Sequence, residues 1–307
     1  MGLRVVEMVL PVLLMIGIGY FCNRRQIFDM NGLKGLKALL GDIMLPVVLF
    51  NAFFTASYSL RVVVVFLVVY LGFGAAIALG FLLRPLVKPY GKYLPFLVAS
   101  AEGGMLGYAL YGLITGSQSG FAAVDLGQTV FAYTVWLGLL TSVDGGEVKA
   151  EKLLKNMISN KCFLGMVFGI VLGAAGVGNV VMNSAAGGIV KSVVSMITAP
   201  VSAVVLLMVG YELNLKKELF LPVLKTIVLR LVIMGALLLV SNLVIFRIFP
   251  FDKELEIALM VLYALPAPFI IPIFSDVGKD GEYVATTLSV HTLVTVALYA
   301  AIVVYSL

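Results

Sequence analysis

Residues 62–83 read VVVVFLVVYLGFGAAIALGFLL, an apolar run that contains no charged side chain. A helix rises about 1.5 Å per residue, so this run extends over about 33 Å, enough to cross a hydrocarbon core about 30 Å thick. A strand of a membrane barrel would instead alternate apolar and polar residues over about ten positions. The stretch therefore predicts a transmembrane α-helix.

The rest of the chain repeats this pattern. Its 307 residues are 62% hydrophobic and 12% charged, with a mean hydropathy of +1.11, whereas soluble domains are about 45–50% apolar and about 25% charged. This composition predicts an all-α integral membrane protein in the lipid bilayer, and it excludes a nucleic-acid-binding domain, a disordered chain and a disulfide scaffold. We expect ten transmembrane segments, at residues 5–21, 36–58, 62–83, 93–114, 121–143, 162–181, 189–211, 220–246, 255–274 and 283–307.

Basic residues orient the predicted segments. Of the 21 Lys and Arg residues, fifteen fall on one side, five on the other, and Arg230 lies within segment 8. Excess Lys and Arg mark cytoplasmic loops, so we expect a multi-pass protein of the plasma membrane with both termini outside. The fifteen basic residues on the predicted cytoplasmic side are Arg24, Arg25, Lys34, Lys37, Arg84, Lys88, Lys92, Lys149, Lys152, Lys155, Lys161, Lys216, Lys217, Lys225 and Lys279. The other side carries Arg4, Arg61, Lys191, Arg247 and Lys253.

The longest polar segment, residues 144–161, separates five predicted spans from five others. Because the number of spans in residues 1–143 is odd, residues 162–307 must have the inverted topology, which is a common plan of secondary transporters. The two halves are also interrupted in corresponding spans. Segment 4 contains Gly103, Gly104 and Gly107, whereas segment 9 contains Pro266, Pro268 and Pro272.

These interruptions predict broken helices at membrane depth. A break leaves backbone N–H and C=O groups unpaired, and it persists only where protein, ions or water satisfy them. Glycine lowers helix propensity by about 1 kcal/mol relative to alanine, and proline removes a donor. The freed N-termini of half-helices carry partial positive charge and hold anions. The alternative is a pair of kinks that pack without binding anything.

Ionisable groups inside a membrane are expensive and are candidates for function. Glu102 lies in mid-span beside the Gly103–Gly104 pair, where burial favours proton exchange; the alternative is a neutral carboxyl held by backbone N–H groups. Asp125 lies one turn into segment 5 and forms a candidate proton or ion site with Gln128. Its alternative is a helix-start residue that favours the N-terminal dipole.

Further polar residues are weaker candidates. His291, the single histidine, is either a proton relay or a buried core residue, and Thr286 and Ser289 beside it either ligate an ion or pack between helices. Asn51 follows Pro46 closely and is a candidate substrate contact. We expect Arg230 to extend its side chain to the cytoplasmic interface, and the absence of an evident buried Arg makes helix termini the first choice for binding an anion.

Four stretches resemble the auxin efflux carrier family. Residues 10–20, 45–51, 125–128 and 265–268 read LPVLLMIGIGY, LPVVLFN, DLGQ and LPAP, and Gly278 and Asp280 follow. The resemblance covers nearly the whole chain. It implies a fold similar to that of bile acid symporters and sodium/proton antiporters, in which a scaffold domain faces a transport domain where helices 4 and 9 break and cross. The resemblance also implies a carrier of organic anions, since bacterial members are often labelled malate permeases, and it implies a homodimer.

The chain departs from the family pattern at the predicted crossing. The family stretch Asn-x-Gly-x-x-Gly-x-Pro-Leu here reads EGGMLGYAL over residues 102–110, so Glu102 takes the Asn position and Ala109 the Pro position. Ile270 falls where segment 9 is expected to hold Asn. With these positions, the predicted substrate site comprises Asn51, Glu102, Gly103, Gly104, Gly107, Pro266, Pro268 and Ile270. The predicted ion or proton site comprises Glu102, Asp125, Gln128, Thr286, Ser289 and His291.

The sequence therefore predicts a secondary transporter of a small organic anion, with H⁺ or Na⁺ as the coupling ion and a homodimer as its expected assembly. A carrier of another small solute, a channel and a receptor remain alternatives. No enzyme is expected, because residues 116–120 (GSQSG) lack the Gly-x-Ser-Gly pattern of a serine protease and there is one histidine. No P-loop is present, so ATP is not the direct energy source. Cys22 and Cys162 lack metal-ligand spacing, and we expect no metal and no cofactor.

Overall fold

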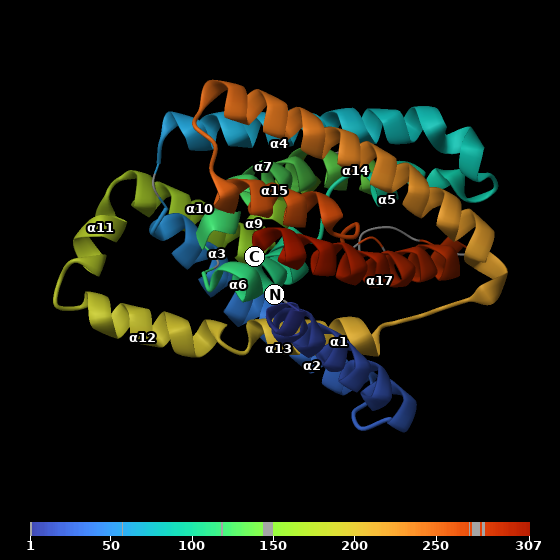
Figure 1. The fold of residues 1–307 in the computed structure, drawn as a ribbon, viewed down its shortest axis with the longest axis horizontal. Helices are drawn as coiled ribbons and strands as arrows, with labels where there is room; N and C mark the ends of the chain where they lie inside the picture. Colours follow the sequence, from blue (N-terminus) through green and yellow to red (C-terminus); the bar gives the residue numbers. More distant parts are fainter. Residues whose placement is uncertain are drawn as a thin grey trace.

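The computed structural model describes residues 2–56, 58–117, 119–143, 150–269, 271, 277 and 280–307, and every regular element in these ranges is helical (Figure 1). The first predicted half contains α1 (Gly2–Arg25), α2 (Met30–Leu39), η1 (Leu40–Met44), α3 (Leu45–Phe54), α4 (Leu60–Leu83), η2 (Arg84–Val87), η3 (Tyr90–Lys92), α5 (Leu94–Val98), η4 (Gly103–Gly107), α6 (Tyr108–Thr115), η5 (Ser119–Phe121), α7 (Ala122–Phe131), η6 (Ala132–Trp136) and α8 (Leu137–Ser142). The remainder contains α9 (Ala150–Ser159), α10 (Lys161–Ala174), α11 (Val177–Met182), α12 (Gly187–Thr198), α13 (Val201–Tyr211), η7 (Lys217–Leu219), α14 (Phe220–Ile248), α15 (Lys253–Ala264) and α17 (Gly281–Ser306).

Seven helical stretches among the described residues are long and apolar enough to cross a membrane: Val5–Arg25, Met30–Phe54, Leu60–Val87, Ala122–Ser142, Gly187–Tyr211, Lys217–Ile248 and Gly281–Ser306. Large apolar side chains on these stretches face outward, including Leu82 (73% exposed) and Met196 (81%). Such a surface is suited to lipid, so the chain is a multi-pass membrane protein. Predicted segments 4, 6 and 9 are not among the seven. Segments 4 and 6 are divided into shorter helices, and the described helix of segment 9, α15, ends at Ala264. The count of ten stays a prediction.

Helix starts follow from short polar residues that the sequence places before apolar runs. Asp29 accepts hydrogen bonds from the backbone N–H groups of Asn31 and Gly32 at 3.0 and 2.9 Å and caps α2. The pKa of the Asp29 carboxyl group is lowered, mainly because the Gly32 backbone N–H donates a hydrogen bond to it. Asn160 and Asp252 cap α10 and α15 in the same way. Each cap satisfies donors that a helix start leaves unpaired.

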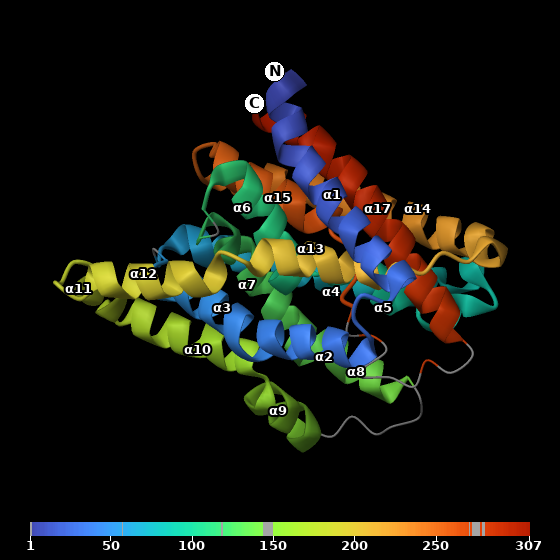
Figure 2. The ribbon, with the colours of Figure 1, turned by 90° about the horizontal axis from the view of Figure 1, so that it is seen from below.

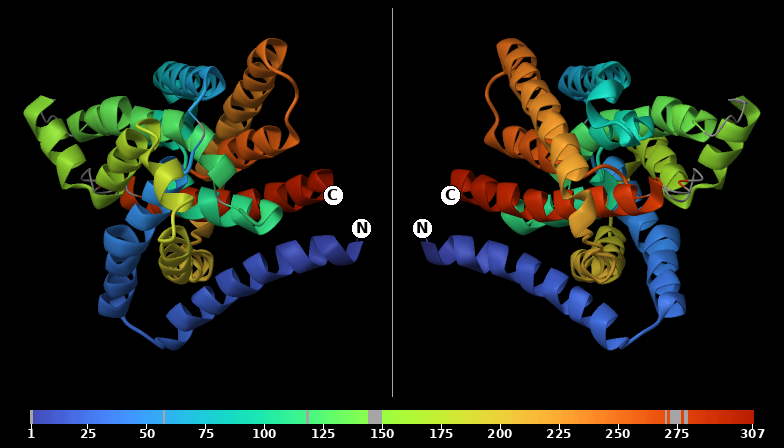
Figure 3. Two further views of the ribbon diagram at one scale, coloured as in Figure 1. Left: turned by 90° about the vertical axis from the view of Figure 1, so that its left-hand side faces the viewer. Right: turned by 90° about the vertical axis from the view of Figure 1, so that its right-hand side faces the viewer.

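The helices form two groups. In the first group, α1 lies along α13 and α3 lies along α10; in the second group, α4 packs on α5, α7 and α14, and α14 packs on α15 and α17 (Figures 1 and 3). The two groups contact each other mainly where α1 packs on α17 and where α13 packs on η4 and α6. We refer to them as the α3/α10 group and the α4/α14 group.

Glycines bring the helices of the α3/α10 group into direct backbone contact. A Cβ added to Gly165 or Gly169 of α10 would lie 2.5 or 2.6 Å from the carbonyl oxygen of Pro46 or Phe50 of α3. Gly19 of α1 meets the backbone of α13 as closely. Small residues at this spacing allow close helix packing in a membrane, where apolar burial gives little driving force between helices.

Three of the ion pairs between described residues lie within one group. Lys37 pairs with Glu212 and Lys161 with Asp42 in the α3/α10 group, at 2.5 and 3.2 Å. Arg61 pairs with Asp252 in the α4/α14 group at 2.9 Å, and Lys216, in the connection between α13 and η7, pairs with Glu282 of α17 at 3.1 Å.

The two termini lie close together at one end of the molecule, and α9 lies at the opposite end (Figure 2). Near the termini, the Lys253 ammonium donates to the carbonyl oxygen of Ser306 at 3.0 Å. The termini and α9 therefore lie at opposite ends of the molecule, and the division into two inverted halves of five spans stays a prediction.

Candidate functional site

The site is built where two helices end and their extended continuations cross. Helix α5 ends at Val98, and the chain is extended at Ala99 before η4 begins at Gly103. Helix α15 ends at Ala264 because Pro266 disfavours helical geometry at Leu265, whose ψ is 152°. The backbone N–H of Glu102 donates to the carbonyl oxygen of Pro266 at 3.0 Å, so the two breaks meet directly.

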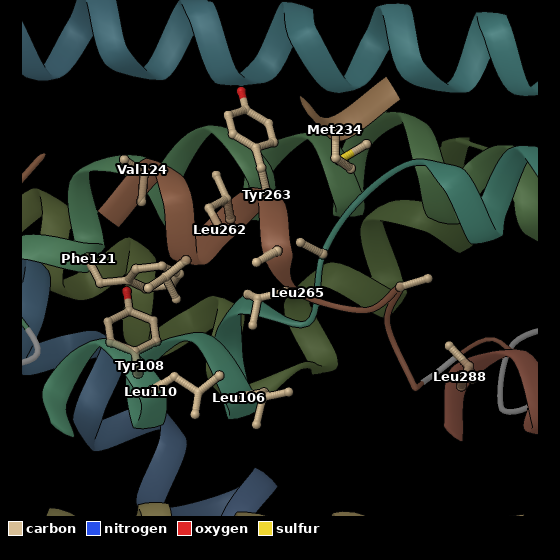
Figure 4. Packing of buried hydrophobic residues seen from close by; sticks show 14 of the residues in the cluster. Leu106, Tyr108, Leu110, Phe121, Val124, Met234, Leu262, Tyr263, Leu265 and Leu288 are labelled. Carbon is tan, nitrogen blue, oxygen red and sulfur yellow. The ribbon is translucent and has the colours of Figure 1, made fainter. Parts of the chain in front are cut away.

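Apolar side chains pack around this crossing (Figure 4). The rings of Tyr108 and Phe121 lie edge to face with centroids 5.0 Å apart. A Cβ added to Gly107 would clash with the Phe121 ring and lie 3.0 Å from Leu265. Gly107, one of the predicted substrate-site glycines, therefore packs inside the protein and serves the close approach of the two breaks.

Arg230 of α14 reaches the crossing from behind. The side chain is 1% exposed, and it donates to the carbonyl oxygens of Leu97 at 2.8 Å, Ser100 at 2.7 Å and Leu265 at 2.8 Å. The predicted extension of Arg230 to the cytoplasmic interface is therefore wrong. Broken helices leave unpaired carbonyls with partial negative charge at this depth, and a guanidinium satisfies several of them at once. The sequence signal that could have indicated this buried role is a single Arg inside an otherwise apolar span.

Glu102 connects the two breaks on the other side. Its carboxylate Oε2 accepts a hydrogen bond from the backbone N–H of Phe269 at 2.7 Å, and its side chain is 6% exposed. Its own carbonyl oxygen accepts from Leu106 and Gly107, so Glu102 also starts the second half of segment 4. The carboxylate thus accepts from a backbone donor just after the break of segment 9.

Asp125 and Gln128 of α7 lie against the same break. The Asp125 side chain is fully buried beside the hydroxyl groups of Tyr108 and Thr129, and its Oδ1 lies so close to Gly103 that an added Cβ would clash. Gln128 donates from Nε2 to Ser100 Oγ at 3.0 Å and to the carbonyl oxygen of Ala101. Gln128 therefore fixes the extended chain, and Gly103 is required by the position of Asp125.

A cavity of about 380 Å³ lies between the two helix groups and ends at the crossing. The α4/α14 group contributes Glu102, Gly104, Gln128, Tyr133, Pro268 and Phe269, among others. The α3/α10 group contributes Lys37, Asp42, Leu45, Lys161, Cys162 and Glu212, among others. Since Ser159 and Asn160 beside α9 also line the cavity, it opens toward the end of the molecule that is opposite the termini.

Other predicted site residues lie elsewhere. Asn51 lines a separate space of about 940 Å³ between α3, α6 and α12, together with Ser117 and Lys191. On α17, Ser289 accepts from the N–H of Asn214 at 2.9 Å, and His291 lies near Arg230 in a small pocket behind the crossing. Thr286 is buried on the same helix, and its hydroxyl lacks a hydrogen-bond partner among the described residues.

The structure thus brings Glu102, Gly104, Gln128 and Pro268 to one cavity, with Gly103, Asp125 and Pro266 directly behind it. It does not bring Asn51 or the α17 residues there. Ile270 lies outside the described residues. Among the described His, Cys, Asp and Glu side chains, no group of three is placed to hold a metal ion. The site can therefore offer backbone donors, a carboxylate and an amide to a small solute.

Comparison with curated proteins finds no match. The sequence profile described as membrane transport protein, which is that of the auxin efflux carriers, matches residues 4–303. The match covers nearly the whole chain, including both breaks and the cavity between the helix groups. The chain belongs to this membrane transport protein family.

Proposed function

We propose that the protein is a secondary transporter that carries a small organic anion, such as a carboxylate, through the cavity at the crossing. The family makes it a membrane transporter, and the substrate and mechanism are the proposal. The observation that carries it is the cavity that ends on two broken helices. A volume of about 380 Å³ lies within the range of about 300–1,000 Å³ that is typical of small-molecule sites.

Backbone donors at the breaks are suited to an anion. The N–H of Phe269 lies just after the break of segment 9 at Pro266, and η4 starts at Gly103, just after the break of segment 4. Backbone N–H groups at such breaks stabilise negative charge. Transporters with broken helices bind anionic substrate groups in this manner near the bilayer midplane. Arg230 satisfies carbonyl groups at the ends of α5 and α15, whereas Glu102, Gly104 and Phe269 line the cavity.

Alternating access follows from the two helix groups. The α3/α10 group is the scaffold, the α4/α14 group is the transport domain, and their relative movement exposes the crossing to each side in turn. The ten predicted helices, arranged as inverted repeats over residues 1–143 and 162–307, provide this pair of domains. We further propose a plasma-membrane protein with both termini outside, a coupling ion and a homodimer formed through the scaffold.

Uptake into liposomes tests this function. Purified full-length protein is reconstituted, and uptake of radiolabelled pyruvate, malate and succinate is measured with proton and sodium gradients imposed separately. Saturable uptake with counterflow of at least one acid is the expected result, because a carrier exchanges bound substrate across the membrane. Unitary currents without counterflow would instead make the protein a channel, and no flux of any acid would contradict the proposed substrate class.

A further inference from the structure

The crossing is the favoured position for a substrate carboxylate in the cavity, because the charges elsewhere on the cavity lining are already paired. The described lysines that line the cavity, Lys37 and Lys161, are each paired with a carboxylate, Glu212 or Asp42. At the crossing, the N–H of Phe269 donates to the Glu102 carboxylate at 2.7 Å. The protein's own carboxylate therefore occupies a donor that a bound carboxylate would use.

We propose that Glu102 and the substrate carboxylate compete for the Phe269 N–H, so that the anion binds when Glu102 takes up a proton and the two cross the membrane together. This inference rests on the proposed function and adds the coupling ion, its site and the sign of the coupling. The proton comes from the water that fills the open cavity, and it leaves Glu102 on the other side after the anion has dissociated.

Electrostatics gives the sign. Two ionised carboxylates at one buried donor repel each other, and their interaction strengthens as the local dielectric falls. Protonation makes Glu102 neutral and removes its stronger, charge-assisted hold on the N–H. Protonation thus favours anion binding, and by reciprocity anion binding favours protonation. The result is symport, with an empty carrier in which Glu102 itself accepts from the Phe269 N–H.

Other charged and titratable groups face Glu102, and the effects of their titration must be distinguished from those of Glu102. Within the cavity these groups are Lys37, Asp42, Tyr133, Lys161, Cys162 and Glu212. Behind the extended chain, Asp125 packs on Gly103 and Arg230 holds the carbonyl of Ser100. Asp125 is the other buried carboxyl at this break, so it is the main competing proton site.

A structural role for Glu102 is the competing explanation, because its carboxylate also ties the two breaks together. Glu102→Gln separates the two roles. A glutamine side chain has nearly the same volume, and its amide oxygen still accepts from the Phe269 N–H, but it does not titrate. If Glu102 only joins the breaks, the glutamine variant retains driven uptake with the pH profile of the wild type.

The test uses full-length protein in liposomes with radiolabelled pyruvate and malate and a pH indicator in the lumen. For the wild type, uptake should acidify the lumen, should not depend on sodium, and should reach about tenfold accumulation of pyruvate per unit of pH gradient for one proton per anion. Glu102→Gln should lose accumulation, lumen acidification and the pH dependence of uptake, while counterflow, which needs no change in protonation, stays measurable. Glu254→Gln is the matched control, since Glu254 is an exposed glutamate at the start of α15, and it should behave as the wild type.

Several outcomes would overturn the inference alone while the proposed function stands. They are wild-type uptake without lumen acidification, driven uptake by Glu102→Gln with an unchanged pH profile, and loss of coupling in Asp125→Asn while Glu102→Gln stays coupled. The wild-type acidification does not depend on any variant folding. Failure of the wild type to transport any acid would overturn the proposed function and this inference with it.

Discussion

The guanidinium of Arg230 donates from Nε and Nη2 to the carbonyl oxygen of Leu265, at 3.3 and 2.8 Å. This contact fastens the C-terminal end of α15 to α14, and further bonds from the same guanidinium fasten the end of α5. The crossing consequently has a cation on its carbonyl side and the Glu102 carboxylate on its amide side. Both charges are matched to the partial charges of the broken helices.

Replacement of Arg230 should destabilise the protein. Arg230→Met leaves the carbonyls of Leu97, Ser100 and Leu265 buried without their donor, and each such loss costs about 1–3 kcal/mol. We expect a clear fall in the melting temperature, measured by size-exclusion chromatography of heated, detergent-solubilised protein. The melting temperature of Arg230→Lys should lie between those of the wild type and Arg230→Met, because an ammonium group cannot reproduce the planar, forked hydrogen-bonding geometry of a guanidinium. An unchanged melting temperature in Arg230→Met, beside an unchanged Arg247→Met control at the exposed end of α14, would contradict this assignment.

Backbone contact between α3 and α10 should make Gly169 intolerant of any side chain. In Gly169→Ala the new Cβ would lie 2.6 Å from the carbonyl oxygen of Phe50, so the helices must separate, at a cost of about 1–3 kcal/mol. Gly74→Ala in α4 is the matched control, because open space surrounds that position and alanine favours helix by about 1 kcal/mol. Thermal unfolding in detergent should therefore shift in opposite directions. Equal shifts would mean that helix propensity, not steric contact, dominates at Gly169.

The prolines of segment 9 should be required for transport but not for membrane insertion. With Pro266 and Pro268 both replaced by Ala, α15 is free to continue past Ala264, which moves the carbonyls that Arg230 and the Glu102 N–H use. Uptake in liposomes should be abolished, while the amount of protein extracted from membranes stays at the wild-type level. Pro222→Ala, in the first turn of α14 where proline is tolerated, serves as the control. Normal uptake by the double variant would reduce these prolines to packing residues.

Cysteine labelling in intact cells tests the orientation. In a variant whose native cysteines are replaced by alanine, a membrane-impermeant maleimide should label Ser306→Cys from outside and should label Lys155→Cys only after permeabilisation. The excess of Lys and Arg on the α9 side is the physical reason. Labelling of Lys155→Cys but not Ser306→Cys in intact cells would reverse the orientation.

The interruptions of the helices could be predicted from the sequence. A local mechanism weakens a helix at each of four residues, Gly103, Gly104, Pro266 and Pro268. The break in segment 4 nevertheless lies at Ala99–Glu102, just before the glycines, because Gln128 and Arg230 hold the extended chain there. Such partners come from helices distant in the sequence, and no local pattern identifies them. Glu102 was recognised because an ionisable residue in an apolar span is conspicuous by itself.

Residues whose roles depend on packing were harder to place. Arg230 was predicted to reach water, because a single sequence does not reveal that two carbonyl-bearing helix ends lie beside it. Asn51 faces a second space between α3, α6 and α12, and which side of α3 meets these helices is set by tertiary packing that the sequence does not reveal. His291 lies on the face of α17 that meets Arg230 and not on the cavity. Hydropathy places such residues at a depth in the membrane but not on a face.

The placement of the ion pairs bears on how the proposed carrier should respond to salt. Lys37–Glu212 and Lys161–Asp42 lie within the α3/α10 group, and Arg61–Asp252 lies within the α4/α14 group. A displacement of one group past the other would leave these three pairs intact. Mobile ions screen exposed charges over about 8 Å at physiological ionic strength, so ion pairs that broke during transport would make its rate depend on salt. Because these three pairs stay within their groups, we expect them to add little salt dependence to the turnover rate.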